Sequence, residues 1–165
     1  MREQDVFSTI INYQKSCPVD VFSLIEQIGI RLGIRLIDVD WNDEISGAIE
    51  KNPKGGYCIS VNVNHPEVRR RFTAAHELGH YFLHREAIDQ VGLADDRLYR
   101  SVDFKSYQNH LIGVKQEAQA NRFAASILMP WRIVEKMKKE GVSVAEMAEK
   151  LKVSKAAMKI RYDSF

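Results

Sequence analysis

Hydrophobic positions recur along this chain first at helical spacing, then at every second residue, then at helical spacing again. Apolar side chains three or four positions apart predict one helix over residues 3–15 and a second one after Asp20, which is suited to cap it. Gly29 and Gly33 mark the end of the second helix. The period then falls to two, which predicts strands over residues 34–39, 46–50 and 57–63.

The third predicted strand alternates strictly between apolar and polar residues, so we expect it to bury only one face. The apolar face carries Tyr57, Ile59, Val61 and Val63, and the other carries Cys58, Ser60 and Asn62. A turn-forming cluster at residues 52–56 predicts that this strand forms a hairpin with the preceding one.

The rest of the chain returns to helical spacing almost to its end. Helices are predicted over residues 67–85, 114–129, 131–140, 143–151 and 154–162. Residues 87–109 mix charges with apolar and aromatic side chains, and they predict a short helix followed by a long loop. Helices, a small antiparallel sheet and further helices follow one another, so the predicted fold class is α+β.

Composition narrows the functional classes. The chain has 165 residues and a formal net charge of +2, which is too weak to indicate a nucleic-acid partner by bulk electrostatics. Cys17 and Cys58 lie far apart without a CxxC motif, so neither a cysteine zinc site nor a redox pair is expected. No basic leader or long apolar run is present, so we expect a cytoplasmic protein without a membrane partner.

Candidate chemistry is concentrated in the HExxH motif His76-Glu77-Leu78-Gly79-His80, inside the helix predicted over residues 67–85. Residues four apart on a helix differ by about 40° around its axis, so both imidazoles can hold one ion. Zinc suits this donor set, although manganese or iron also accepts two histidines and a carboxylate. Glu77 lies about 100° round the helix from His76, where it can reach a water molecule on the ion and act as general base. The motif therefore predicts hydrolysis of an amide bond.

Two histidines and one water leave a tetrahedral ion one protein ligand short. His84, His110 and Glu117 are the downstream candidates. His84 is displaced about 80° and two turns from His76, so one straight helix does not easily bring it to the same ion. Glu117 begins a strongly helical stretch whose alanines would let it pack closely against the motif helix. We therefore expect His76, His80 and Glu117 to be the metal ligands.

Two supporting roles follow from the predicted hydrolysis. Asn121 lies one turn after Glu117, where its side chain can form a hydrogen bond with a ligand imidazole. The oxyanion formed during hydrolysis needs a further donor, and this position stays open among Tyr57, Tyr81, Tyr99, Tyr107 and His110. An edge strand of the small sheet could bind an extended peptide by strand addition.

The HExxH motif and Glu117 lie in two longer stretches, RFTAAHELGHYFLH at residues 71–84, and EAQANRFA with LMP at residues 117–124 and 128–130. Together these stretches resemble the ImmA/IrrE family of zinc-dependent peptidases. The resemblance covers the pattern from about Pro18 to Leu151. It implies the same three metal ligands, with Glu77 as the catalytic base. The expected fold is then a small antiparallel sheet beside a zincin-like active-site helix, which packs against several further helices.

The resemblance also implies a substrate. Proteins of this family typically cleave a helix-turn-helix repressor encoded nearby, in mobile elements, prophages or stress regulons, and so relieve repression. We therefore expect a metalloendopeptidase with one zinc ion per chain. Residues 1–165 would form a single metallopeptidase domain, with a catalytic core over residues 1–140 and a helix-turn-helix-like closing segment over residues 141–165.

That closing segment allows a second interpretation. Lys155, Lys159 and Arg161 give its last helix positive charge that could meet phosphates, although the weak net charge favours a purely structural segment, and direct DNA binding is not expected. A DNA-binding regulator with a structural metal site, and a module that sequesters a repressor without cutting it, remain alternatives. The enzyme is favoured because structural zinc sites usually have four protein ligands.

Overall fold

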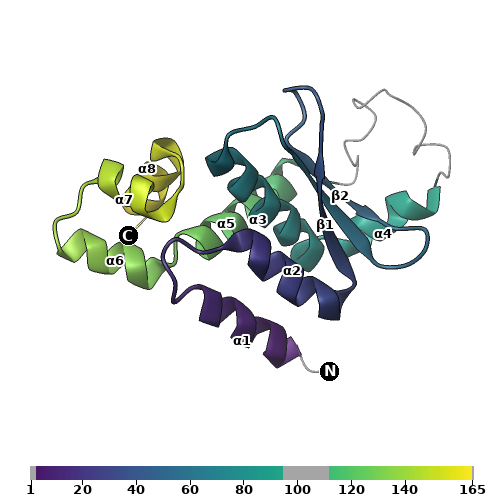
Figure 1. Cartoon of the computed structure of the whole chain (residues 1–165), viewed down its shortest axis with the longest axis horizontal. Helices are drawn as coiled ribbons and strands as arrows, with labels where there is room; N and C mark the ends of the chain where they lie inside the picture. Colours follow the sequence, from purple (N-terminus) through teal and green to yellow (C-terminus); the bar gives the residue numbers. More distant parts are fainter. Residues whose placement is uncertain (1–2, 95–111, 165) are drawn as a thin grey trace.

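The computed structural model describes residues 3–94 and 112–164, which form helices on either side of a small sheet in the sequence (Figure 1). The helices are α1 (Glu3–Tyr13), α2 (Val21–Leu32), α3 (Glu67–Leu83), α4 (Arg85–Ala94), α5 (Val114–Leu128), α6 (Trp131–Lys139), α7 (Val144–Leu151) and α8 (Lys155–Asp163). The strands are β1 (Ile34–Val39), β2 (Gly47–Lys51) and β3 (Tyr57–Asn62). The predicted α+β class is confirmed.

The sheet is mixed, with the strand order β1-β3-β2. β2 and β3 are antiparallel, with Gly47 opposite Val61 and Lys51 opposite Tyr57, so the predicted hairpin is confirmed. β1 instead runs parallel to β3, with Ile34 opposite Tyr57. The prediction of a wholly antiparallel sheet was wrong because the third strand lies between the other two.

The central position of β3 also changes its burial. Ile59 and Val61 are fully buried as predicted, but Ser60 and Asn62 on the other face are buried too, whereas Val63 beyond the strand is 39% exposed. The Asn62 amide nitrogen donates to the carbonyl oxygens of Asn42 and Ile45 at 2.8 and 2.7 Å. Asn62 thereby fixes the segment that carries the chain across from β1 to β2, and this crossing places β3 between them.

The start of α2 follows from its cap. Asp20 accepts a hydrogen bond from the Ser23 backbone at 3.1 Å, as its position before an apolar run predicts. Gly33 ends the helix in the left-handed conformation, with φ 69°, which is inexpensive for glycine. α2 buries Val21, Leu24 and Ile25, so it anchors the helical layer to the sheet.

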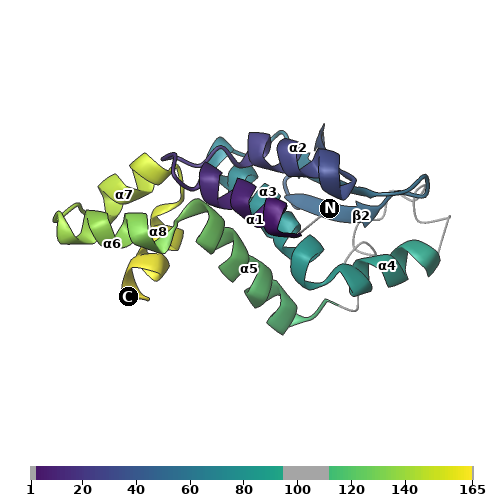
Figure 2. The ribbon, with the colours of Figure 1, turned by 90° about the horizontal axis from the view of Figure 1, so that it is seen from below.

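α3 lies at the centre of the molecule, packed against α5, the sheet and α2 (Figure 2). Its apolar side chains join one cluster of buried residues that runs from α2 and β3 to the C-terminal helices. The cluster includes Leu24, Ile25, Ile28, Ile59, Leu78, Leu128, Met129, Met147, Leu151 and Met158. Because α3 is fixed on several sides, the polar side chains that it carries have fixed directions.

α3 ends one turn after His80, where a single helix was predicted to continue to residue 85. The His84 N–H still bonds to the His80 carbonyl at 2.8 Å, but its ψ of 25° departs from helical values. α4 begins directly afterwards at Arg85. The predicted short helix after residue 87 therefore begins slightly earlier, and residues 95–111 lie outside the described chain.

α7 and α8 form the predicted pair of short helices. Ser143 and Glu146 make reciprocal hydrogen bonds in a capping box, and Ser154 accepts from the Ala157 backbone at 3.1 Å. Lys152 links the helices in the left-handed region, with φ 50°. Figure 1 shows α6 to α8 at the end of the molecule opposite the sheet. Within residues 3–94 and 112–164, no helix has the length and apolar character needed to span a membrane.

Candidate metal centre

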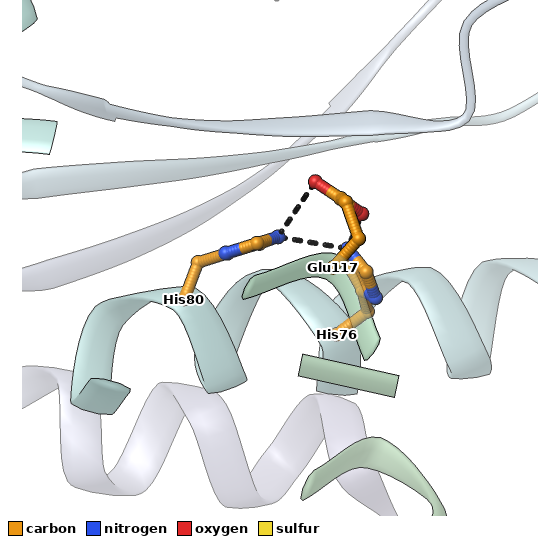
Figure 3. Close-up of side chains that lie close together, drawn as sticks. All are labelled: His76, His80 and Glu117. Atoms are coloured by element: carbon orange, nitrogen blue, oxygen red, sulfur yellow. Dashed lines mark hydrogen bonds and ion pairs between the residues drawn. The ribbon is translucent and has the colours of Figure 1, made fainter. Parts of the chain in front are cut away.

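The side chains of His76, His80 and Glu117 converge where α5 crosses α3 (Figure 3). The two histidine Nε2 atoms lie 2.9 Å apart. The carboxylate of Glu117 faces both rings, with Oε2 at 3.2 Å from Nε2 of His76 and Oε1 at 3.4 Å from Nε2 of His80. The three residues that were predicted as ligands are therefore brought together from two helices.

The spacing of these atoms fits a tetrahedral ion. Ligands at about 2.0–2.1 Å from zinc lie about 3.3 Å from one another along the edges of a tetrahedron. The observed separations of 2.9, 3.2 and 3.4 Å are close to that value. Two imidazole nitrogens and a carboxylate are also a donor set that zinc accepts. Glu117 is half exposed, so the centre opens to solvent on that side.

The close crossing of α3 and α5 depends on small residues. A Cβ at Gly79 would lie 3.2 Å from both Cα and the carbonyl oxygen of Ala120, which is tighter than ordinary packing. Ala120 and Ala124 are fully buried at this crossing. The prediction that small residues let α5 pack closely on the motif helix is thus confirmed, and the contact brings Glu117 within reach of the histidines.

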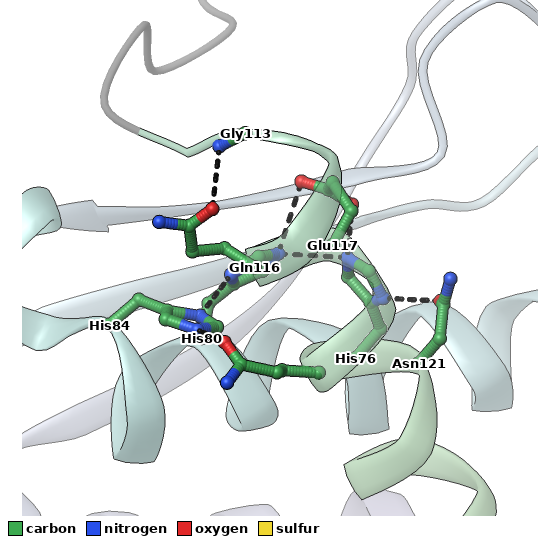
Figure 4. Close-up of polar contacts among 8 residues, drawn as sticks. His76, His80, His84, Gly113, Gln116, Glu117 and Asn121 are labelled. Carbon is green, nitrogen blue, oxygen red and sulfur yellow. Dashed lines mark hydrogen bonds and ion pairs between the residues drawn. The ribbon is translucent and has the colours of Figure 1, made fainter.

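Asn121 lies beside one of the two imidazoles that were predicted as ligands. Its Oδ1 is 2.9 Å from Nδ1 of His76 (Figure 4). An amide oxygen can only accept, so Nδ1 carries the proton and Nε2 presents its lone pair. Asn121 therefore favours the tautomer of His76 that a metal ligand needs.

His80 is only 3% exposed, and its environment keeps it neutral. Burial lowers the pKa of His80 to about 3, with smaller contributions from His76 and His84. A neutral imidazole is the form that binds metal. Nδ1 of His80 lies 3.0 Å from Nδ1 of His84, the candidate third ligand that helix geometry had disfavoured. His84 lies outside the group formed by His76, His80 and Glu117.

Glu77 is buried beneath the edge strand β2. A Cβ on Gly47 would lie 3.6 Å from Cγ of Glu77 and 2.3 Å from Cγ2 of Thr73, so the strand backbone passes directly over this part of α3. Burial raises the pKa of Glu77 to about 8, and the negative charge of Glu117 adds to the shift. Both effects disfavour the charged form of this carboxyl, which lies next to the residues predicted as ligands.

Gly47 was not identified as a site residue from the sequence. A side chain there would also lie 2.8 Å from the Ser60 carbonyl oxygen, so only glycine lets β2 lie this close to Glu77. A glycine inside a strand pattern commonly marks a close approach of backbone, and that signal could have identified it.

Two of the tyrosines considered as oxyanion donors have other partners. The Tyr57 hydroxyl donates to Asp89 at 2.6 Å, and burial together with this bond raises the pKa of Tyr57 to about 12. The Tyr81 hydroxyl donates to the Leu32 carbonyl at 3.4 Å. The remaining candidates, Tyr99, Tyr107 and His110, lie outside the described residues.

Lys159 and Arg161, two of the basic residues of α8, have partners within the described chain. Lys159 pairs with Asp163 at 2.9 Å, and Nε of Arg161 donates to the Met129 carbonyl at 3.0 Å. The Arg161 bond attaches α8 to the junction between α5 and α6, whereas the Lys159 pair lies within α8 itself.

The fold recurs in a solved structure. A chain described as a Mycobacterium tuberculosis transcriptional regulator superposes with a TM-score of 0.60 at 17% identity, covering 95% of this chain and 46% of that one. This chain thus spans about half of that protein, and the likeness shows a shared fold. A curated relative, "Uncharacterized immunity region protein 2" of Bacillus phage phi105, is 28% identical over 139 residues, which is 84% of this chain and 75% of the relative.

The family model Peptidase_M78, described as the IrrE N-terminal-like domain, matches residues 30–163. This range contains the sheet, the HExxH helix and α5, and it extends through α8. The match agrees with the resemblance inferred from residues 71–84 and 117–130. The chain therefore belongs to the Peptidase_M78 (IrrE N-terminal-like) family, which indicates a metallopeptidase.

Proposed function

We propose that this chain is a zinc-dependent endopeptidase that cleaves a helix-turn-helix transcriptional repressor and so relieves repression. One observation carries the proposal: His76, His80 and Glu117 converge at the spacing of a single ion, directly beside the buried carboxyl of Glu77. Family membership supports the peptidase activity.

The roles of the residues follow from their positions. When bound, a zinc ion would polarise the scissile carbonyl and lower the pKa of a water molecule. Glu77 accepts the proton as that water attacks the carbonyl, and it then donates the proton to the departing amine. Asn121 orients His76, and the half-exposed side of Glu117 leaves access for substrate.

β2 offers a means of binding a peptide main chain. It lies at the edge of the sheet formed by the described strands, and Gly47 brings it close to Glu77. An extended substrate segment that adds to this edge would align its carbonyl groups with the strand. Strand addition selects for an unfolded or extended segment, which suits cleavage within a flexible part of a repressor.

The regulatory setting rests on the resemblance and on one relative. The phage phi105 protein is named for an immunity region, which agrees with the repressor control that the resemblance implies. We propose that the protein acts in the cytoplasm, where it would encounter a transcriptional repressor. Residues 1–140 would act as the catalytic core, and residues 141–165 would close it through contacts such as the hydrogen bond from Arg71 to the Lys152 carbonyl at 3.3 Å.

The test measures metal content and cleavage together. Wild-type protein, Glu77→Gln and Glu117→Ala are purified, their zinc content is determined, and each is mixed with the helix-turn-helix repressor encoded beside the gene. We expect wild type to hold one zinc ion and cut. Glu77→Gln should hold zinc without cutting, and Glu117→Ala should lose zinc.

Other outcomes contradict the proposal in distinct ways. Zinc binding without cleavage, together with a stable complex, would support sequestration of the repressor. Specific DNA binding that depends on Lys155 and Lys159 and survives Glu77→Gln would support a regulator. Wild-type protein that binds no ion would overturn the metal centre itself.

A further inference from the structure

His84 does not converge with the three side chains of the metal centre, yet it contacts one of them. Its Nδ1 lies 3.0 Å from Nδ1 of His80, and its Nε2 lies 3.0 Å from Oε1 of Gln119 on α5. The rings of His80 and His84 are 5.1 Å apart between centroids (Figure 4). These contacts connect α5 to the far side of a predicted metal ligand.

The contacts from Gln119 through His84 to His80 indicate which ring nitrogens carry a proton, because each N–H must face an atom that can accept it. The Gln119 amide oxygen only accepts, so Nε2 of His84 donates to it. When the His84 ring is neutral it has one N–H, so its Nδ1 is left as an acceptor. The N–H between the two rings therefore belongs to Nδ1 of His80. Its Nε2 is left with a lone pair, directed toward Nε2 of His76 and Glu117.

We propose that His84 and Gln119 form a positioning pair, which holds His80 in the tautomer and ring orientation that bind the metal. This inference rests on the metal centre of the proposed function and adds two residues that are not ligands. Without the pair, His80 can place its proton on Nε2, where it blocks the lone pair, and its ring can rotate. Losing such an orienting partner typically lowers metal affinity about 10–100-fold.

The proposal explains why the two imidazole ligands have different partners. Asn121 accepts directly from His76, whereas Gln119 acts on His80 through the intervening ring of His84. Both amide oxygens come from α5, two positions apart, on the helix that also supplies Glu117. The same helix therefore supplies one ligand and orients the other two.

A matched pair of variants tests the role of His84. Asparagine has an acceptor oxygen at the branch position where histidine has Nδ1, and leucine has nearly the same shape without an acceptor. Zinc affinity is measured on the full chain by competition with a chromophoric chelator, and the visible spectrum of the cobalt-substituted protein reports ligand geometry. His84→Leu should weaken zinc binding about 10–100-fold and alter the cobalt spectrum. His84→Asn should stay close to wild type in both measurements.

Gln119→Met tests whether the two residues act in series. This change removes the acceptor and should weaken zinc binding in the wild-type background. It should have no effect in the His84→Asn background, where the asparagine oxygen accepts from His80 without help. An equal loss of zinc affinity in both backgrounds would show that Gln119 does not act through His84.

Three results separate the possible failures. His84→Leu with wild-type zinc affinity and cobalt spectrum would overturn the proposal. Equal losses in His84→Leu and His84→Asn, accompanied by equal decreases in the unfolding temperature of the metal-free protein, would show a structural role and also overturn it. Wild-type protein that binds no zinc would instead refute the proposed metal centre, and this is known before any variant is compared.

Discussion

Gly79 of α3 and Ala120 of α5 meet with no room for an additional methyl group, since a Cβ on Gly79 would lie 3.2 Å from the Ala120 Cα. On α3 the two histidines flank this contact, and on α5 Glu117 and Asn121 flank it. The distance between the helices at Gly79 therefore sets the distance between Glu117 and the imidazoles. A substitution at this contact can therefore alter the geometry of the proposed metal centre even though the predicted ligand residues are unchanged.

Gly79→Ala should separate stability from metal affinity. Alanine gains up to about 1 kcal/mol of helix propensity, which offsets part of the cost of moving α5 by a few tenths of an ångström. We expect the free energy of unfolding of the metal-free protein to change by about 1 kcal/mol or less. Zinc affinity should fall, since Glu117 moves with α5. Chelator competition and urea unfolding measure the two quantities, and unchanged affinity would contradict the prediction.

Gly47→Ala should be more damaging. Its Cβ would lie 2.3 Å from Cγ2 of Thr73 and 2.8 Å from the Ser60 carbonyl oxygen, so β2 must move away from α3. Overpacking of this kind costs about 1–3 kcal/mol, which urea unfolding would measure. Thr73→Ser removes Cγ2 but leaves the clash with Ser60, so the double variant should recover only part of the loss. Full recovery would show that the strand backbone is not a barrier.

Glu77→Gln should reduce turnover without releasing zinc. The amide cannot accept the proton from water, and general acid–base catalysis contributes about 10²–10⁴-fold to such reactions. The rate of repressor cleavage is measured at saturating zinc. Glu77→Asp keeps the acid on a shorter side chain and should retain more activity than Glu77→Gln. Equal rates in Glu77→Gln and wild type would exclude Glu77 as the base.

Asn121→Leu should weaken zinc binding through His76. The leucine cannot accept from Nδ1, so the imidazole loses the partner that sets its tautomer. We expect affinity to fall about 10–100-fold. Asn121→Asp retains an acceptor of similar size and should bind zinc at least as tightly as wild type. A loss of equal size in both variants would point to packing instead.

The cap of α2 gives a prediction about pH. The Ser23 hydroxyl and backbone N–H both donate to Asp20, and these bonds lower the pKa of its carboxyl. A lowered folded-state pKa means that this stabilisation is present above the unfolded pKa of about 3.9 and is lost as the pH falls through the folded value. Asp20→Ala should cost about 1 kcal/mol at pH 7.

The difference in free energy of unfolding between wild type and Asp20→Ala should be smaller at pH 3 than at pH 7. Urea unfolding at the two pH values measures it. Asp20→Asn serves as the control because its amide oxygen caps the helix without titrating. A difference between Asp20→Ala and wild type that is equal at both pH values would show that the charge of Asp20 plays no part.

Features set by local spacing could be predicted from the sequence. His76 and His80 lie on one helix face because four residues make about one turn, and the alanines of α5 predicted its close packing. Gly33 and Ser143 likewise mark helix ends where the structure has them. The helix faces and helix ends depend only on neighbours within a few residues, and the close packing of α5 follows from its small side chains.

Features set by contacts between distant segments could not be predicted. The parallel pairing of β1 and β3 depends on Asn62, a polar residue that strict alternation assigns to an exposed face, and on carbonyl groups up to twenty-one residues away. The end of α3 at Leu83 was also missed, because a helix pattern does not show its own last residue. Gly47 matters only because Thr73 lies beneath it.

The dependence of the centre on α5 has a thermodynamic consequence. Glu117, Gln119 and Asn121 all leave their positions if this helix separates from α3, and the HExxH helix alone would then keep only two ligands with neither orienting contact. An ion that prefers the docked arrangement stabilises it by an amount that grows with the logarithm of the free-ion concentration. The concentration of free metal ion would thus be coupled to the fraction of molecules with α5 in place, and the occupancy of the centre would depend on the tertiary structure.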